Sequence, residues 1–281
     1  MFQNQRIFQV AEVISKIKRS IVDHMDCAVL AMSGGADSTL CAILCQEALG
    51  AEHVHSVHMP YGARDNKFFN HRSIHTAKHL KLHIHHIPIT DAVNTSLQVC
   101  ENALGEPLEK VNKGNIRSRE RMKVLYTIAH HIGSKTKKRV RTIGTGNLSE
   151  DFIGYDTKFG DAACDLFIIG ELLKSEVYQL LDYFRDRGTI TEDMIDRVPS
   201  AGLWEQQTDE QELGFSYKAM ANPILELQDE MYESCQTCGK KELHQLAEDS
   251  THDAEIKKFV RQRHLSHRHK HLAPEVTKVF S

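Results

Sequence analysis

The chain has 281 residues, of which 26% are charged, and its formal net charge is −3. This length permits a large buried core, and the balanced charge gives no sign of a nucleic-acid groove or an anionic membrane as a partner. The N-terminal stretch lacks the apolar centre of a signal peptide, and no apolar run is long enough to cross a bilayer. We therefore expect a cytoplasmic protein whose seven cysteines are reduced thiols.

Apolar residues recur at alternating helix-like and strand-like spacings along the chain. The pattern predicts a helix over 5–24 and then strands at 27–32, 53–59, 82–89, 139–146 and 166–170. Helices are predicted between them at 37–50, 67–80 and 174–187, with two more after the third strand, the second around 117–133. Strands separated by helices indicate an α/β domain over 1–281, with a doubly wound, Rossmann-like parallel sheet of about five strands flanked by helices. Turn signals predict a loop region over 188–230.

The string AMSGGADST (31–39) lies where the first strand meets the next helix. Glycines at such a turn let the backbone approach a ligand closely, and the free N–H groups of a helix start attract anions. The string therefore indicates a phosphate cradle, although a glycine turn that only joins strand to helix is the alternative. No lysine precedes the second serine, which excludes a Walker A loop.

The Ser-Gly-Gly-x-Asp-Ser string resembles the loop of the N-type ATP pyrophosphatases, the PP-loop superfamily, which split ATP into AMP and pyrophosphate. Four more stretches are similar to ammonia-dependent NAD synthetase: RSRERMKVLYTIAH (117–130), GTGNLSEDFIGYDTKFGDAACD (144–165), LLKSEVYQL (172–180) and PSAGLWEQQTDEQELGFSY (199–217). The resemblance implies an adenine nucleotide alpha hydrolase-like fold. It also implies a C–N ligase that uses ATP, Mg²⁺ and ammonia to convert deamido-NAD to NAD through an NAD-adenylate. A tRNA-modifying or thiolating enzyme of the same superfamily is the alternative.

Residues at positions that match the family take their roles from this resemblance. Asp37 and Glu150 are expected to hold Mg²⁺, a hard cation that takes oxygen ligands. Asp161 and Lys174 are expected to be catalytic, with Asp161 attracting ammonium and accepting its proton. The expected ATP-binding residues are Ala31, Met32, Ser33, Gly34, Gly35, Ala36, Asp37, Ser38, Thr145, Lys174 and Ser200. The expected deamido-NAD-binding residues are Arg119, Lys158, Asp165, His269 and Lys270.

Several of these features have a plainer interpretation on residue type alone. Lys174 could be a surface lysine, Glu150 a solvated acid at a helix start, and the arginines of 117–121 an exposed helix face. The histidine-rich stretch 263–276 could be a basic tail, but its HKHLAP string resembles the terminal lid of the family, so we expect a lid there. Cys235 and Cys238 form an incomplete zinc set and are expected to be free thiols.

Two local departures from the family leave details open. The pattern GDGG becomes GDAA, with Ala162 and Ala163, which bears on the local backbone geometry because alanine does not adopt positive φ freely. The acids that usually follow the MPYG string are replaced by Lys67, Phe68 and Phe69, so the adenine contacts of 60–72 stay undetermined.

The expected partners are deamido-NAD, ATP and ammonia, with no nucleic acid and no membrane. By analogy with the resembling enzymes we expect a homodimer, for which the apolar residues Val124, Leu125 and Ile128 offer surplus helix surface. Free ammonia is expected as the nitrogen donor, because the phosphate loop begins at residue 33, Phe2 follows Met1, and the cysteines lack the glycine-rich elbow of a glutaminase nucleophile.

Overall fold

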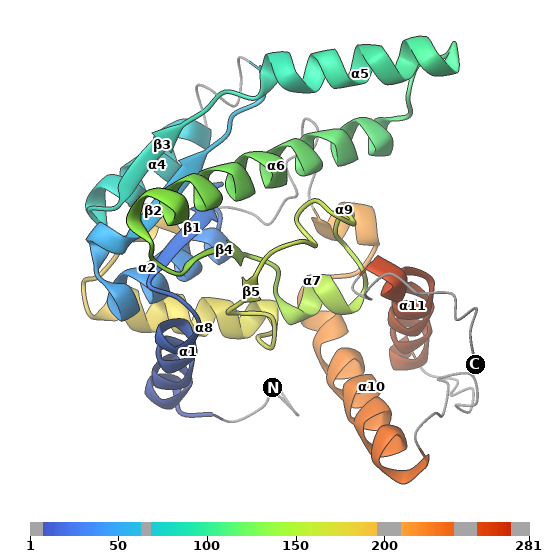
Figure 1. Cartoon of the computed structure of the whole chain (residues 1–281). Helices are drawn as coiled ribbons and strands as arrows, with labels where there is room; N and C mark the ends of the chain where they lie inside the picture. Colours follow the sequence, from blue (N-terminus) through green and yellow to red (C-terminus); the bar gives the residue numbers. More distant parts are fainter. Residues whose placement is uncertain (1–7, 63–68, 196–208, 239–251, 271–281) are drawn as a thin grey trace, which may run out of the picture.

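The computed structural model describes residues 8–62, 69–195, 209–238 and 252–270. Five parallel strands form one sheet in the order β3-β2-β1-β4-β5 (Figure 1). They are β1 (Cys27–Ala31), β2 (Val54–His58), β3 (His83–His86), β4 (Val140–Gly144) and β5 (Leu166–Phe167). The predicted α/β class and strand number are confirmed. The strand order reverses between β1 and β4, and ligands of such sheets bind where the two carboxyl ends meet.

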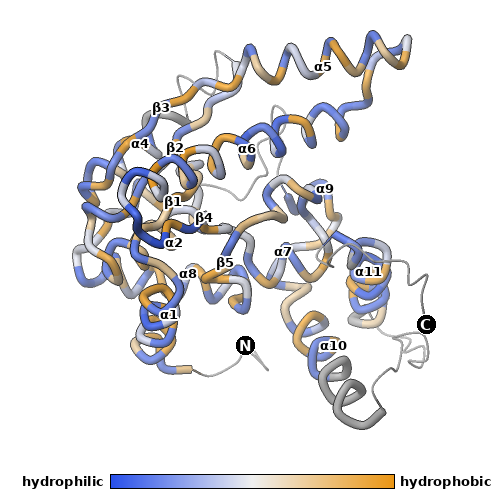
Figure 2. Tube along the Cα trace, viewed as in Figure 1, coloured by the Kyte–Doolittle hydropathy of each residue, from blue (hydrophilic) through white to orange (hydrophobic). Residues whose placement is uncertain are grey.

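Helices cover both faces of this sheet (Figure 1). One face packs against α1 (Val10–His24), α2 (Ala36–Leu49), α4 (Phe69–His79) and α8 (Lys174–Asp186). The other packs against α5 (Thr90–Leu104) and α6 (Lys110–Thr136). Along β1 the side chains of Ala28 and Leu30 enter the first core and Val29 enters the second, as the alternation of a strand requires. In Figure 2 the turns of α1 alternate between hydrophobic and hydrophilic colours, which is typical of a helix with one buried face.

The C-terminal helices pack on a short helix beside the sheet rather than on the sheet itself. This helix, α7 (Leu148–Phe152), shares a core with α9 (Asp209–Leu213), α10 (Tyr217–Cys238) and α11 (His252–His267), which is followed by η4 (Arg268–Lys270). The predicted loop region over 188–230 is wrong where α9 and α10 lie. Met220, Ile224 and Leu227 are buried at helical spacing against α11, and this packing outweighs the turn signals. No helix in the described ranges is long and apolar enough to cross a membrane.

Smaller differences concern the ends of elements and one apolar surface. The first helix begins at Val10, and the stretch predicted as the second strand begins with a short helix, η1 (Ala51–His53), while η2 (Glu192–Met194) follows α8. The surplus apolar surface expected on α6 is not there, because Leu125 is buried and Val124 and Ile128 pack against the same core.

A buried histidine lies at the end of β2, where the strand meets α4. His58 hydrogen-bonds through Nδ1 to Ser73 Oγ at 2.8 Å and through Nε2 to Ser56 Oγ at 3.2 Å. Burial lowers the pKa of His58 to about 4, and the neighbouring His86 and His85 add to the effect. Folding therefore favours the neutral imidazole.

We expect the free energy of unfolding to decrease as the pH falls from about 6.5 towards about 4, because the unfolded chain binds a proton that folded His58 resists. His58→Gln should reduce the difference in unfolding free energy between pH 7 and pH 4.5 by about 1–3 kcal/mol. Urea titrations at both pH values measure it. His131→Gln, at an exposed position on α6, is the control. An unchanged pH dependence in His58→Gln would contradict the assignment.

Candidate active site

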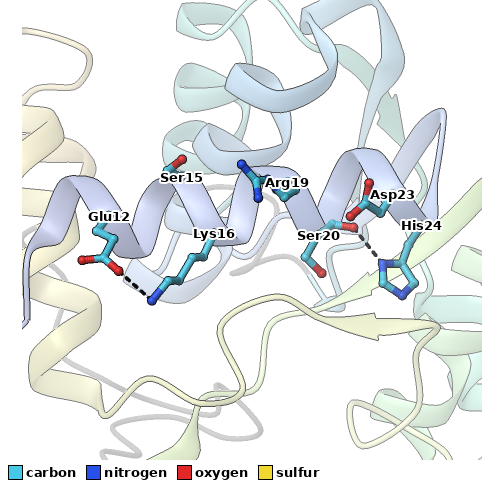
Figure 3. Close-up of a pocket in the computed structure, with 7 residues that line it drawn as sticks. All are labelled: Glu12, Ser15, Lys16, Arg19, Ser20, Asp23 and His24. Carbon is cyan, nitrogen blue, oxygen red and sulfur yellow. Dashed lines mark hydrogen bonds and ion pairs between the residues drawn. The ribbon is translucent and has the colours of Figure 1, made fainter.

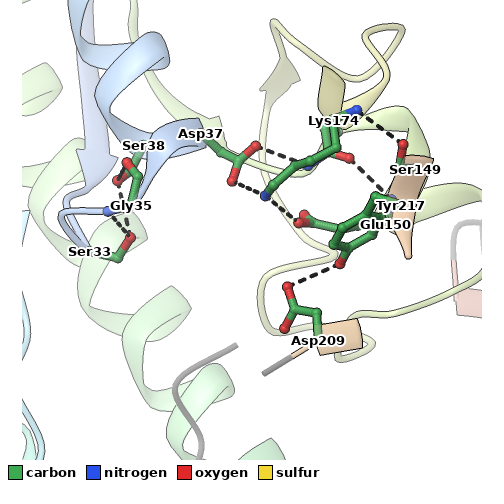
Figure 4. A network of polar contacts seen from close by, with 10 residues as sticks. Ser33, Gly35, Asp37, Ser38, Ser149, Glu150, Lys174, Asp209 and Tyr217 are labelled. Atoms are coloured by element: carbon green, nitrogen blue, oxygen red, sulfur yellow. Dashed lines mark hydrogen bonds and ion pairs between the residues drawn. The ribbon is translucent and has the colours of Figure 1, made fainter. Parts of the chain in front are cut away.

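Three charged side chains from three helices meet beyond the carboxyl ends of β1 and β4 (Figure 4). Lys174, the first residue of α8, donates from Nζ to Asp37 Oδ2 at 2.6 Å and to Glu150 Oε1 at 2.9 Å. Asp37 lies in the first turn of α2 and Glu150 in α7. The fold thus brings together three predicted site residues, with Lys174 lying 137 and 24 positions from its partners along the chain.

Neutral side chains hold this charged cluster in place. Asn147 donates from Nδ2 to Asp37 Oδ1 at 2.9 Å, and its own Oδ1 accepts from the backbone N–H of Glu150 at 3.2 Å. It is therefore the N-cap of α7 and also a link to α2. Ser149 Oγ accepts from the backbone N–H of Lys174 at 3.0 Å.

The wall of the cluster is supplied by Tyr217 at the start of α10. Its ring centroid lies 5.5 Å from Lys174 Nζ, and its hydroxyl donates to buried Asp209 at 3.0 Å. Sequence reasoning did not select Asn147, Ser149, Asp209 or Tyr217. Asparagine just before a helix is an N-cap signal that could have drawn attention to Asn147, whereas nothing local marks Tyr217, since its role depends on how α10 packs.

The cluster carries more negative than positive charge. Only 7% of the Lys174 side chain is exposed. Burial lowers the pKa of Lys174, but the two carboxylates raise it more, so the ammonium is retained. Burial and the nearby charge of Asp37 raise the pKa of Glu150, despite the opposing effect of Lys174. Two converging carboxylates that one ammonium does not fully balance are suited to a hard divalent cation.

The SGGADS loop lies next to the cluster and is closed on itself (Figure 4). Ser33 Oγ accepts from the backbone N–H of Gly35 at 3.2 Å and lies 3.1 Å from Ser38 Oγ, which also donates to the Gly35 carbonyl. Gly34 has φ of +74°, and a Cβ there would lie 3.1 Å from the backbone nitrogen of Ser73, so only glycine fits. The loop leads directly into α2, whose first N–H groups have no helical partner.

The remaining predicted ATP residues lie at the same edge of the sheet where they are described. Ala31 ends β1, Met32 is buried behind the loop, and Thr145 follows β4 directly. Ser200, residues 63–68 and the lid residues 271–276 lie outside the described residues. The side chains of Cys235 and Cys238, in α10, are likewise not described.

Asp161 is held by the loop on which it lies and by α6. Its Oδ1 accepts from Ser118 Oγ and from the backbone N–H of Thr157, both at 2.8 Å. Burial by surrounding protein raises the pKa of Asp161, although the residue keeps part of its surface open to solvent. The positive φ values of this segment belong to Gly154 and Phe159, so Ala162 and Ala163 replace the family glycines without backbone strain.

Four of the five residues predicted to bind deamido-NAD come together. Arg119 donates from Nε to the Lys158 carbonyl at 3.2 Å, and Lys158 Nζ donates to the His269 carbonyl at 2.8 Å. Lys270, next to His269, reaches the same loop at Gly154. Asp165 is the exception, because its Oδ2 accepts from the backbone N–H and the hydroxyl of Thr142 within β4.

The arginine run of α6 does more than form an exposed face. The Arg117 guanidinium lies 4.0 Å from the ring centroid of Tyr61, and Arg121 donates to the Met59 carbonyl at 3.4 Å. Both contacts lie just beyond the end of β2. They direct positive charge to the carboxyl edge of the sheet, on the side of the MPYG string.

Figure 3 shows a different hollow, of about 420 Å³, on the outer side of α1. Its lining comes from this one helix: Glu12, Ser15, Lys16, Arg19, Ser20, Asp23 and His24. The polar contacts drawn there, Lys16 to Glu12 and His24 to the Ser20 carbonyl, are both within the helix. Among the described residues, no group from another element lines it, so the charged cluster, and not this hollow, is the candidate active site.

Comparisons with known proteins identify the family to which the chain belongs. The family described as NAD synthase matches residues 10–272. The NH(3)-dependent NAD(+) synthetase of Fusobacterium nucleatum is 38% identical over 191 residues, covering 68% of this chain and 68% of that protein. The structure of NMN synthetase from Francisella tularensis has a TM-score of 0.74 at 26% identity, covering 98% of this chain and 100% of that one. The NH3-dependent NAD synthetase from Campylobacter jejuni, in complex with the nitrate ion, has a TM-score of 0.71 at 25% identity, covering 97% and 100%. Since the family match includes the SGGADS loop, Glu150, Asp161 and Lys174, the chain belongs to the NAD synthase family.

Proposed function

We propose that the protein amidates deamido-NAD with ammonia at the expense of ATP, giving NAD, AMP and pyrophosphate. The observation that carries the proposal is the cluster of Asp37, Glu150 and Lys174 beside the SGGADS loop. The relatives named NH(3)-dependent NAD(+) synthetase support ammonia as the nitrogen donor.

The reaction needs charge neutralisation and alignment more than covalent help from the protein. A carboxylate resists attack by ammonia because it is anionic and has no good leaving group. Transfer of the adenylyl group from ATP to the carboxylate releases pyrophosphate and gives an acyl adenylate. Ammonia then attacks the acyl carbon, and AMP leaves. Groups fixed in advance against developing negative charge are the main means by which an enzyme lowers such barriers.

The loop and the cluster divide this task on the ATP side. The N–H groups of the loop and of the first turn of α2 bind the departing pyrophosphate, and Lys174 stabilises it as a point charge. Asp37 and Glu150 fit Mg²⁺, because an oxygen of each converges on one point and the two acids outnumber Lys174. In the described part of the chain no group of three His, Cys, Asp or Glu side chains could hold a metal ion, so Mg²⁺ would need further ligands from phosphates and water. Mg²⁺ would supply further neutralisation of the phosphates.

The Asp161 loop serves the second half of the reaction. Ammonium is not nucleophilic until it loses a proton, and a fixed carboxylate can both attract the cation and accept that proton. Asp161 is fixed by Ser118 and Thr157. Arg119, Lys158 and the His269–Lys270 segment line the same loop and bind deamido-NAD, together with Asp165. Thr145 and Ser200 complete the proposed ATP contacts.

The mononucleotide analogue, nicotinic acid mononucleotide, is a second candidate substrate. It carries the same pyridine carboxylate, and the similar structure from Francisella tularensis is named NMN synthetase. Both substrates pass through the same adenylate chemistry. The difference lies in whether the adenosine half of deamido-NAD is required for binding.

The proposed reaction is tested by incubating the purified protein with ATP, Mg²⁺ and ammonium, and with deamido-NAD or nicotinic acid mononucleotide in parallel. Mass spectrometry should detect NAD and AMP with deamido-NAD, and ammonia-free glutamine should not replace ammonium. Asp37→Asn should lower the rate by about 100-fold or more, because it removes charge from the cluster. Glu12→Gln, which neutralises an exposed acid in the first turn of α1, should change nothing. Absence of NAD from the wild-type reaction would refute the proposal.

Asp161→Asn should slow amide formation by at least about tenfold and leave adenylate formation largely intact, because the amide keeps the shape of the side chain but accepts no proton. Single-turnover reactions that follow pyrophosphate release and NAD separately measure the two steps. Equal losses in both steps would assign Asp161 to substrate binding instead.

We also propose a cytoplasmic homodimer, for which the hairpin of α5 and α6 offers a surface. The two helices run side by side and extend beyond the sheet (Figure 1), and their exposed apolar residues are Val99, Leu104 and Val111. Light scattering should give twice the chain mass of 32.0 kDa, and Val99→Glu with Val111→Glu should give the monomer. A single-chain mass for the wild type at assay concentration would disprove the dimer.

A further inference from the structure

The C-terminal segment binds a run of backbone carbonyls just after α7. His264 Nδ1 donates to the Phe152 carbonyl at 2.9 Å, and Arg263 Nε donates to the Ile153 carbonyl at 3.2 Å. Lys270 Nζ donates to the carbonyls of Gly154 at 2.7 Å and Asp156 at 2.6 Å. Three basic side chains thus bind four of the five carbonyls between residues 152 and 156.

The end of α7 explains why basic side chains gather here. The last carbonyls of a helix have no partner within the helix and carry the negative end of its dipole. α7 ends at Phe152, and the chain then turns at Gly154, where φ is +61°. A Cβ on Gly154 would collide with the side chain of His267, so α11 touches the backbone at this point.

Lys270 is the most completely bound of these basic residues. Its Nζ donates to the two carbonyls and forms an ion pair with Asp156, whose Oδ1 lies 3.4 Å away. Only 5% of the Asp156 side chain is exposed. A buried carboxylate needs a paired cation, so Lys270 and Asp156 depend on each other.

The bound stretch continues directly into the residues proposed for chemistry. One position beyond Asp156, the backbone N–H of Thr157 donates to Asp161 Oδ1 at 2.8 Å. One position further, Lys158 Nζ donates to the His269 carbonyl at 2.8 Å. The segment 154–161 is therefore held at one end by Lys270 and at the other by the carboxylate that it presents.

We propose that Lys270 is a positioning residue that, with Asp156, fixes segment 154–161 and through Thr157 sets the place of the Asp161 carboxylate. The expected effect of Lys270 on turnover rests on the proposed function, whereas the binding of Lys270 to segment 154–161 does not. Lys270 thereby gains a positioning role in addition to the deamido-NAD contact expected for it, because its Nζ hydrogen-bonds to the carbonyls of Gly154 and Asp156. α11 and η4 act as a clamp on the Asp161 loop, from the side opposite the ATP loop of α2.

The decisive experiment compares Lys270→Met with Lys258→Met, which alters an exposed lysine of α11. Hydrogen–deuterium exchange without substrates should become at least about tenfold faster for the amides of 152–161 in Lys270→Met, and should stay unchanged in β1 and in the control variant. In turnover assays, Lys270→Met should lower kcat by at least about tenfold and leave the KM for ATP within about twofold, because only the Asp161 loop loses its position.

Two readouts keep this inference separate from the proposed function. Unchanged exchange in 152–161 would overturn the clamp even if the enzyme makes NAD, whereas a wild-type protein that makes no NAD leaves the exchange result standing. Equal changes in kcat and in the KM for ATP would assign Lys270 a general structural role and overturn the positioning role. Faster exchange in β1 as well would mean that Lys270→Met destabilises the whole fold. In that case Asp156→Asn is tested in its place, since this variant keeps both hydrogen bonds of Lys270 to backbone carbonyls. The same exchange and kinetic criteria then decide.

Discussion

A lysine ammonium buried between two carboxylates is the interaction on which the candidate site depends. Removing charges from water is costly unless they are paired, so Lys174, Asp37 and Glu150 stabilise one another only if the starts of α8, α2 and α7 meet at one point. The reversal of strand order between β1 and β4 brings about that meeting, since α2 follows β1 and α7 follows β4. The neutral groups of Asn147 and Ser149 complete the hydrogen bonding around it.

The five-residue helix α7 joins the two halves of the site. Its first turn carries Glu150 and is capped by Asn147, which also holds Asp37 on the ATP side. Its last carbonyls face the C-terminal clamp, and the chain that leaves it carries Lys158 and Asp161. Both ends of α7 are thus tied to side chains of other elements, and its buried residues share a core with α10 and α11.

Packing, and not local preference, accounts for the places where sequence interpretation failed. Residues 217–230 carry a proline and lie close to strong turn signals, yet they form α10, because Met220 and Ile224 face a partner helix that begins only at His252. Val124, Leu125 and Ile128 indicated spare apolar surface, but Leu125 is buried and the other two are half-buried against the core on the second face of the sheet. In both cases the residues that bury these side chains are remote in sequence. A short stretch of sequence therefore cannot predict the helix or the burial.

The sequence by itself determined the alternation of strands and helices, the parallel sheet, and the phosphate loop, because each is written in local spacing and residue type. It also indicated Asp37, Glu150, Lys174 and Asp161 as candidate site residues, through strings whose order matches one family. The tertiary structure alone decided that Lys174 binds both carboxylates, that Tyr217 and Asp209 form the wall beside it, and that Asp165 binds within β4. It also decided that Lys270 holds a loop. These contacts join residues 8 to 137 positions apart, and only the completed packing of helices brings their polar atoms within hydrogen-bonding distance.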